Sequence, residues 1–300
     1  MLNPTKVVIR AIVECLQAGY RNTYGGIKPD YADVIGWVAN IALESLAQSN
    51  ALYHNVEHTI LVTLAGQEIL RGKHIREANV SCEDWLNFIV SLLCHDIGYV
   101  KGACSQDRAD EGWYAKGIND EMMTLPVGAT DASFTAYHVD RGKQFIDEHF
   151  RVHPLIDTEV VKCNIERTRF PVPADATYQD TTDYPGLARA ADLIGQLSDP
   201  RYLQKVTALF HEFEEIGLNR QLGYGNPEDV RSGYPNFYRT VVVPYIQDGG
   251  LHHLATTEEG RQIIANLYAN VSVVERNSLR TLPERIIGQR NQGASASHNA

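Results

Sequence analysis

Three short groups of residues carry the side chains that could do chemistry in this chain. His54 and His58 stand four residues apart, and the adjacent pair His95 and Asp96 follows further along. A further carboxylate, Asp192, lies late in the chain within an apolar run. Imidazole and carboxylate groups hold borderline or hard divalent metals over an open coordination position. The set therefore predicts a metal centre able to activate water.

Each group also has an ordinary explanation when it is taken alone. On a helix predicted for residues 53–70, His54 and His58 point to one face, where they hold one metal jointly or are two surface histidines. Asp192 alone carries little information, except that a carboxylate inside the apolar segment 187–197 is costly to bury without a cation. The joint occurrence of these side chains on three separate apolar helices is what indicates a metal site.

The composition limits the kinds of protein and partner that are expected. Of 300 residues, 44% are hydrophobic and 21% charged, as in ordinary globular proteins. The net charge of −10 and the lack of a basic stripe argue against duplex nucleic acid as a partner. Five scattered cysteines predict reduced thiols in the cytoplasm. We find no signal peptide and no apolar stretch long enough to span a bilayer, so no membrane partner is expected.

Apolar segments with helical periodicity dominate the chain and predict a single all-α domain. The helices that position the candidate ligands are predicted at residues 31–48, 53–70, 83–96, 131–149, 158–168, 187–197, 200–218, 237–248 and 257–279. Irregular segments are predicted at residues 103–130, with one short helix, and at 171–185 and 223–236. The domain is expected to span residues 1–288, followed by a polar, disordered tail at 289–300.

The sequence motifs around these residues resemble those of the HD-domain metal-dependent phosphohydrolase superfamily. Within it, they are closest to the motifs of the class I cyclic-nucleotide phosphodiesterases. Residues 53–58 resemble the YHNxxH word of those enzymes, and residues 190–193 resemble their ADLSNP word. Further matches, in the same order, are Asp131, Ser133, His138, Thr168, Glu212, Phe213, Phe237 and Pro244. The resemblance covers roughly residues 51–274 and implies an HD-type helical bundle.

The resemblance also implies roles for individual residues. The metal ligands would be His58, His95, Asp96 and Asp192. Asp96 would in addition bridge to a second metal and to the attacking hydroxide, and His54 would be the general acid. Phe237 would stack on a flat ring, and His138 would bind a second metal or donate a hydrogen bond beside it. The implied activity is hydrolysis of a small phosphoester, such as a nucleotide or cyclic-nucleotide-like phosphodiester, with one or two ions of zinc, manganese, magnesium or iron.

Four positions depart from the pattern of that family. The second histidine of its HDxxH word is Tyr99 here, and the glutamate that orients the general acid falls on Ala136. The purine-binding glutamine falls on Tyr234, and an aspartate falls on Arg169. We therefore expect Tyr234 and Arg169 to shape a different substrate site. Arg169 either clamps a terminal phosphate with Arg167 or lies at a solvated helix end.

Two other functions stay open at this point. An HD-fold di-iron oxygenase needs two more histidines before Asp192; His138 supplies one, and only Glu166 stands where the other is expected. A non-catalytic nucleotide-binding sensor would explain the missing glutamate and glutamine, although such a module has no use for a proton donor such as His54. The sequence leaves the substrate and the oligomeric state open.

Overall fold

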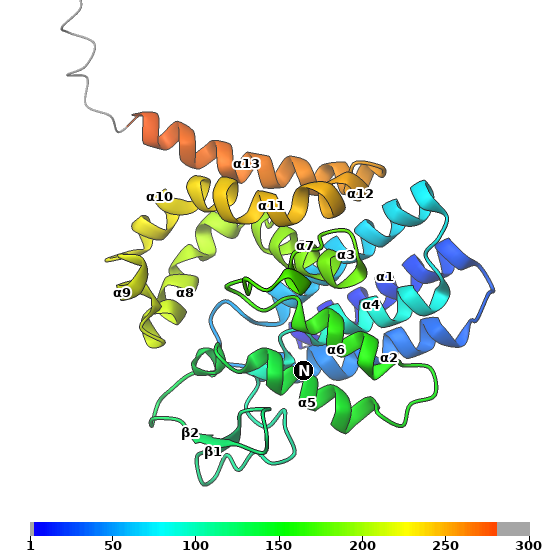
Figure 1. Ribbon diagram of the computed structural model, residues 1–300, viewed down its shortest axis with the longest axis horizontal. Coiled ribbons are helices and arrows are strands. Elements are labelled where there is room, and N and C mark those ends of the chain that lie inside the picture. Colours follow the sequence, from blue (N-terminus) through cyan, green and yellow to red (C-terminus); the bar gives the residue numbers. More distant parts are fainter. Residues whose placement is uncertain (1–2, 281–300) are drawn as a thin grey trace, which may run out of the picture.

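The computed structural model of the protein describes residues 3–280, with side chains as far as residue 277. Helices form nearly all of the regular structure in this part of the chain, so the predicted all-α class is confirmed (Figure 1). The predicted tail at residues 289–300 and the end of the predicted domain lie outside the described residues. Among residues 3–280, no helix combines the length and apolar character needed to cross a membrane.

The first half of the bundle carries the candidate ligands. Its helices are α1 (Pro4–Tyr24), α2 (Asp30–Leu46), α3 (Val56–Glu77), α4 (Cys82–Cys94), α5 (His138–Phe150), α6 (Thr158–Glu166) and α7 (Tyr184–Leu197). Helix α3 packs along α7 and α4 in the middle of the molecule. The core between them is formed by fully buried apolar side chains, among them Trp85, Phe88 and Leu92 of α4.

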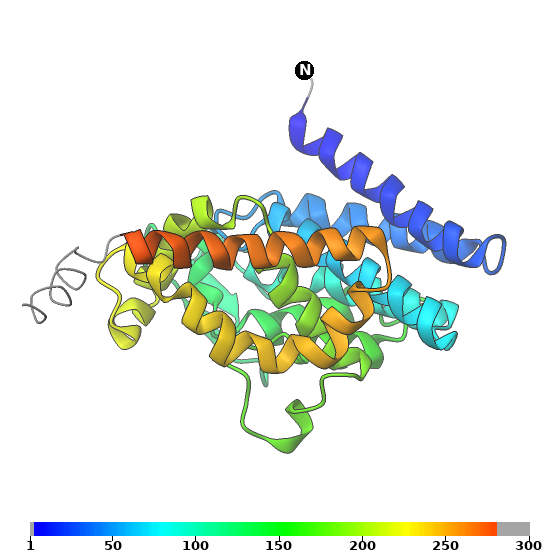
Figure 2. The same cartoon turned by 90° about the horizontal axis from the view of Figure 1, so that it is seen from above.

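The second half covers one face of this core. Its helices are α8 (Tyr202–Glu215), α9 (Leu218–Leu222), α10 (Pro227–Phe237), α11 (Val243–Ile246), α12 (His252–Leu254) and α13 (Glu258–Arg280). Two π-helical segments, Tyr238–Val242 and Gln247–Leu251, flank α11. Helix α13 lies beside the run from α10 to α12, whereas the amino-terminal half of α1 projects from the body (Figure 2).

Two irregular segments predicted from the sequence differ in the structure. Residues 103–130 contain no α-helix; they hold a small antiparallel hairpin of β1 (Trp113–Ala115) and β2 (Met122–Thr124). The strands are too short to show a period in the sequence, and the buried guanidinium of Arg141 fixes them by donating to the carbonyl of Ala115. Residues 223–236 mostly form helix α10, because Asn226 and Asp229 make a capping box at its start.

The predicted helix at residues 53–70 begins later than expected. The side chain of Asn55 accepts a hydrogen bond from Glu57 N and so caps α3, which starts at Val56. His54 therefore lies in the loop before the helix, and the expectation that it shares a helical face with His58 is wrong. The predicted helix at 131–149 is also divided, into a 3₁₀ turn at Asp131–Phe134 and α5.

Candidate metal centre

The close crossing of α3 and α7 brings the first two candidate ligands together. A side chain at Gly195 of α7 would place its Cβ 2.6 Å from Val62 Cα of α3, so glycine is required for this approach. His58 lies one turn before Val62 on α3, and Asp192 lies about one turn before Gly195 on α7. The same crossing that packs the core therefore places an imidazole opposite a carboxylate.

The other two ligands come from the end of α4, where the backbone turns. His95 caps α4, and Asp96 precedes the 3₁₀ turn Ile97–Tyr99. His58 Nε2 lies 3.2 Å from Asp192 Oδ1, 3.3 Å from Asp96 Oδ2 and 3.4 Å from His95 Nε2. The ligand atoms of His58, His95 and Asp192 all lie within 4.8 Å of one another. This group could hold a metal ion, as the sequence predicts.

The unsatisfied polar atoms of this cluster fit a cation. Asp96 is 3% exposed, and its Oδ2 is buried without a hydrogen-bond partner among the described residues. Such an atom is costly in a protein interior unless a donor or a positive charge reaches it. His95 Nδ1 donates to the carbonyl oxygen of Leu92 at 2.8 Å, which leaves Nε2 free to face the cluster. The carboxylate of Asp192 is partly exposed, so the cluster is open on that side.

Protonation of the cluster follows from its burial and its charges. Burial alone would raise the pKa of Asp96, but the charge of His95 holds it well below its usual range. Burial alone would lower the pKa of His95, but the charge of Asp96 raises it to about 9. The carboxylate is therefore ionised at neutral pH. A divalent cation would replace the imidazole proton as its counter-charge.

Beside the cluster, His54 is held by a carboxylate. Its Nδ1 lies 2.6 Å from Glu212 Oε2, and Glu212 Oε1 accepts hydrogen bonds from the backbone N–H groups of Tyr53 and His54. Burial lowers the pKa of His54, but the charge of Glu212 and this hydrogen bond raise it to about 9. His54 is thus a protonated imidazole at neutral pH, with its ring centroid 5.5 Å from that of His58.

Tyr99 takes the place of the second histidine in the HDxxH pattern. Its buried ring is stacked between those of His54, at 4.8 Å, and His138, at 4.4 Å. A side chain at Gly98 would place its Cβ 1.9 Å from the carbonyl oxygen of His138, so this glycine lets α5 approach. His138 Nε2 is 3.9 Å from Asp96 Oδ1. His138 therefore lies at the edge of the cluster, and its role beside a second metal stays a prediction.

The predicted phosphate clamp, Arg169, is engaged by carboxylates. Its guanidinium hydrogen-bonds to both oxygens of Glu166 and to Asp140 Oδ1. These partners raise the pKa of Arg169, with the hydrogen bond to Glu166 as the largest cause. A phosphate would have to compete with both carboxylates, and the clamp stays a prediction.

The other two predicted substrate residues lie on α10. Tyr234 is 2% exposed and packs against Tyr202 at a ring distance of 5.0 Å, so it belongs to the core. Phe237 is partly buried, and its ring meets that of Phe170 edge-on at 6.0 Å. The aromatic neighbour of Phe237, Phe170, is exposed to solvent, whereas the ring of Tyr234 is too buried to contact a substrate in this arrangement. Their contacts with a substrate stay predictions.

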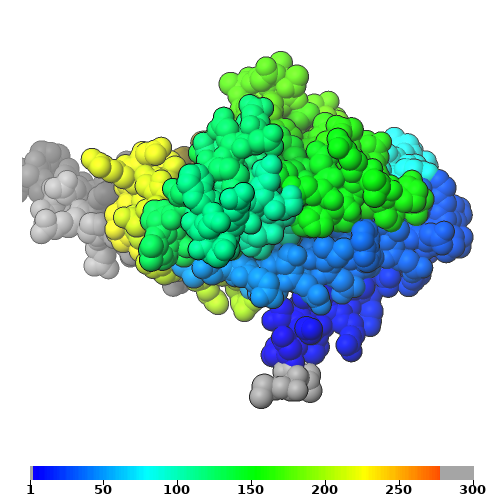
Figure 3. All heavy atoms as spheres, turned by 90° about the horizontal axis from the view of Figure 1, so that it is seen from below, coloured from blue at the N-terminus to red at the C-terminus, as the bar shows by residue number. Residues whose placement is uncertain are grey.

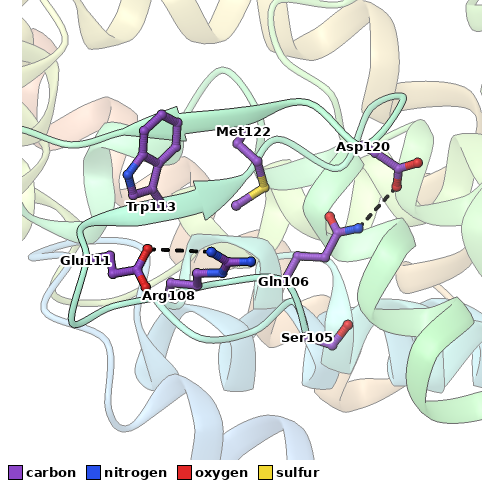
Figure 4. Close-up of a pocket in the computed structure, with 7 residues that line it drawn as sticks. All are labelled: Ser105, Gln106, Arg108, Glu111, Trp113, Asp120 and Met122. Carbon is purple, nitrogen blue, oxygen red and sulfur yellow. Dashed lines mark hydrogen bonds and ion pairs between the residues drawn. The ribbon is translucent and has the colours of Figure 1, made fainter.

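A surface hollow beside the hairpin lies apart from the cluster. It has a volume of about 590 Å³ and is lined by polar and apolar side chains, including Trp113 and Met122 (Figure 4). Arg108 pairs with Glu111, and Gln106 donates to Asp120, among the side chains that line it. None of the candidate ligands lines this hollow, so we do not assign it to the metal centre.

Sequence reasoning assigns no role to two residues of the site. Glu212 lies in α8 near Phe210 and Phe213, and an acidic residue between these two aromatic side chains is the signal that could have indicated its burial and pairing. At Tyr99 the sequence shows only the absence of a histidine. Its stacking between two imidazoles depends on a contact of α5 with the turn after α4, which no local pattern shows.

The fold and the site define an all-α protein with a buried histidine–aspartate cluster that could hold a metal ion. The chain matches the model of the Npun_R2479-like family over residues 2–277, and it therefore belongs to that family. No curated protein matches the chain.

Proposed function

We propose that this protein is a metal-dependent phosphohydrolase of the HD type that acts on a small phosphoester, in the first place a nucleotide or cyclic-nucleotide-like phosphodiester. One observation carries the proposal: His58, His95, Asp96 and Asp192 converge in a buried cluster. The protonated His54–Glu212 pair stands next to it. A site for a cation beside a proton donor is what hydrolysis of a phosphoester requires.

The bound ion would be held by His58, His95, Asp96 and Asp192. When bound, a divalent metal lowers the pKa of a coordinated water and offsets charge on the phosphate oxygens. His95 is kept in the tautomer that presents Nε2, because its Nδ1 donates to the carbonyl oxygen of Leu92. The ionised state of Asp96 makes it a ligand at neutral pH.

His54 would supply the proton to the leaving oxygen. Its Nδ1–H is committed to Glu212, so Nε2–H is the donor that remains. Glu212 is itself fixed by the backbone N–H groups of Tyr53 and His54, and it holds the imidazole in one orientation. Positioned proton transfer of this kind typically contributes about 10²–10⁴-fold in rate.

The two alternatives find less support. Glu166, the candidate iron ligand of the oxygenase hypothesis, has its carboxylate bound to Arg169, Lys143 and Tyr178. It would have to leave three partners to reach a second metal. The sensor hypothesis gives no role to the His54–Glu212 pair, whose buried ion pair has a cost in desolvation that a binding module has no reason to bear.

A hydrolysis screen tests the proposal. The purified protein is freed of metal with a chelator and assayed on bis(4-nitrophenyl) phosphate, cyclic nucleotides, and nucleoside mono- and triphosphates, with zinc, manganese, magnesium or iron(II) added. We expect metal-dependent turnover, with a phosphodiester as the best substrate. Oxygen consumption with iron and no phosphoester hydrolysis would support the oxygenase instead. Tight nucleotide binding without turnover under any metal would support the sensor.

A further inference from the structure

Two arginines of the described residues are fully buried, but only one of them has a carboxylate partner. Arg141 forms an ion pair with Asp107, and its Nη2 lies 2.9 Å from Asp107 Oδ2. Arg189 on α7 is 2% exposed, and among the described residues it makes no ion pair with a carboxylate. A buried guanidinium without a direct ion pair is costly, because its charge is removed from water.

Among the described residues, Arg189 donates hydrogen bonds to carbonyl oxygens and packs on an aromatic ring. Its Nη1 donates to Tyr178 O at 2.7 Å, its Nη2 donates to Asp180 O at 3.2 Å, and Nε is buried without an acceptor in this part of the chain. The guanidinium lies 4.2 Å from the centre of the Tyr245 ring. Burial and the charge of Arg167 lower the pKa of Arg189 to about 10, although the charges of Asp183 and Asp180 act in the opposite direction. The Nε–H group is therefore an unused donor for an anion.

A second guanidinium converges on the same oxygen. Arg167 Nη1 donates to Asp180 O at 3.3 Å, and this is the oxygen that accepts from Arg189. Arg167 Nη2 also pairs with Asp183 Oδ2 at 3.0 Å. Two positive groups thus point at one neutral acceptor. An oxygen of a phosphate at that place would accept stronger, charge-assisted hydrogen bonds from both.

The shared oxygen belongs to an exposed loop. Residues 171–183, between α6 and α7, project from the body as a lobe (Figures 2 and 3). Their inner end is seated by close contacts: an added Cβ at Gly186 would lie 2.5 Å from Asp180 O, and one at Gly249 would lie 2.1 Å from Thr181 O. Residues 180–181 therefore cover the two arginines, whereas most of the remaining loop is solvent-exposed.

We propose that Arg167 and Arg189 form a binding site for a phosphate group, and that the loop at residues 171–183 is a lid whose Asp180 carbonyl occupies the site until phosphate displaces it. Phosphate can engage Nε and Nη2 of Arg189 side by side, which would satisfy the Nε that has no acceptor. Opening of the lid would release the carbonyl oxygens of Tyr178 and Asp180 to water. The ligand is either free phosphate or the phosphate of a small molecule.

This site is separate from the metal cluster. Arg189 and Asp192 lie on the same helix, about 4.5 Å apart along its axis, but they contact different groups. None of the four candidate metal ligands contacts the arginine pair through a hydrogen bond or ion pair among the described residues. The proposal therefore stands whether or not the protein hydrolyses phosphoesters.

Calorimetric titration of metal-free protein with inorganic phosphate, and separately with phenyl phosphate, tests the site. Removing the metal prevents phosphate from binding at the His58–His95 cluster. We expect saturable binding that Arg189→Gln and Arg167→Gln each weaken by about tenfold or more, as loss of a charge-assisted hydrogen bond implies. The matched control is Arg151→Gln, which removes the same charge from an exposed position. Tighter binding of phenyl phosphate would indicate a small-molecule phosphomonoester, and equal binding would indicate free phosphate.

Movement of the lid has its own readout. Hydrogen exchange of the backbone in residues 171–183 should rise when phosphate is added to the wild-type protein, and it should not change in Arg167→Gln. Arg167 is less buried than Arg189, so this variant keeps the proposal testable if loss of Arg189 prevents folding. Absence of phosphate binding by the metal-free wild type would overturn the proposal. Binding that both glutamine variants retain at full strength would overturn it as well.

Discussion

His54 Nδ1 lies 2.6 Å from Glu212 Oε2, although 158 positions separate the two residues in the chain. The pair joins the loop before α3 to the last turn of α8, next to the histidine–aspartate cluster. Since the charge of Glu212 outweighs the effect of burial, His54 keeps its proton above neutral pH. In the proposed reaction, this imidazole would be the acid that protonates the leaving oxygen, and the proposal has measurable consequences.

Replacing Glu212 should move the pH dependence of the reaction. Without the carboxylate charge, the pKa of His54 falls from about 9, because the cause that raises it is gone. His54 must be protonated to donate, so the rate declines as pH rises through its pKa, and Glu212→Gln should shift this decline to lower pH. The profile of kcat/KM against pH measures the shift. Glu215→Gln, which removes a carboxylate bonded to Thr130 instead, should leave the profile in place.

Loss of the proton donor should depend on the leaving group. His54→Ala should keep its metal, because His58, His95, Asp96 and Asp192 remain. Turnover of an alkyl phosphodiester should drop by about 10²–10⁴-fold, whereas an activated nitrophenyl ester, which needs little protonation, should lose much less. Steady-state kinetics on the two substrates make the comparison. Equal losses would argue that His54 does not act as the acid.

The aromatic side chain at the end of α10 should affect substrate choice. Phe237→Ala should weaken substrates with a flat ring by about 1–3 kcal/mol, in the range found for stacking of a base on an aromatic residue. Phosphoesters without a ring should be spared. KM values for a nucleotide and for an alkyl phosphodiester test this selectivity, and Phe213→Ala provides a control on a partly buried phenylalanine of α8. An unchanged ratio would remove Phe237 from the substrate site.

Acid should destabilise the packing of α12 on α3 through His253. Burial, aided by the charge of Lys73, lowers the pKa of His253 to about 4. In the unfolded chain, His253 has its ordinary pKa of about 6.5 and binds a proton below that pH, whereas in the folded protein it stays neutral down to about pH 4. The free energy of unfolding therefore falls as the pH drops from about 6.5 towards 4. Urea unfolding should show His253→Gln losing less stability over this range than the wild type, by on the order of 1 kcal/mol.

A histidine on another helix offers the matched control for that experiment. His211 lies on α8 and is exposed. His211→Gln should therefore follow the wild-type dependence of unfolding on pH. A slope that His253→Gln leaves unchanged would show that another group is responsible for the loss of stability in acid.

The histidine–aspartate cluster could be predicted from the sequence because its residues are unusual where they occur. An aspartate within the apolar stretch of α7, and a histidine–aspartate pair ending the apolar helix α4, both need a reason to be buried. Each of these polar residues stands out against the apolar residues of its own helix, so it can be recognised in the sequence before the packing of the helices is known. The close approach of Gly195 to Val62, which makes the cluster compact, becomes visible only when the helices are packed.

The parts that could not be predicted depend on contacts between distant segments or on capping. Helix α10 contains few apolar residues and several turn-forming residues, and its capping box outweighs them. The apolar pattern predicts a helix that begins at residue 53 and includes His54, but Asn55 caps α3 after His54. The pairing of Glu212 with His54 and the stacking of Tyr99 arise from contacts between segments that are distant in the chain. Periodic patterns in the sequence indicate local helices and do not indicate such contacts.

Elemental analysis of the purified wild type beside Asp96→Ala, with hydrolysis measured on the same samples, tests the central claim most directly. We predict about one or two metal ions per chain in the wild type, and loss of both the metal and the hydrolytic activity in the variant. Circular dichroism confirms that the variant keeps its helices. Full activity in an Asp96→Ala protein that contains no metal would contradict the assignment of this cluster as a catalytic metal centre.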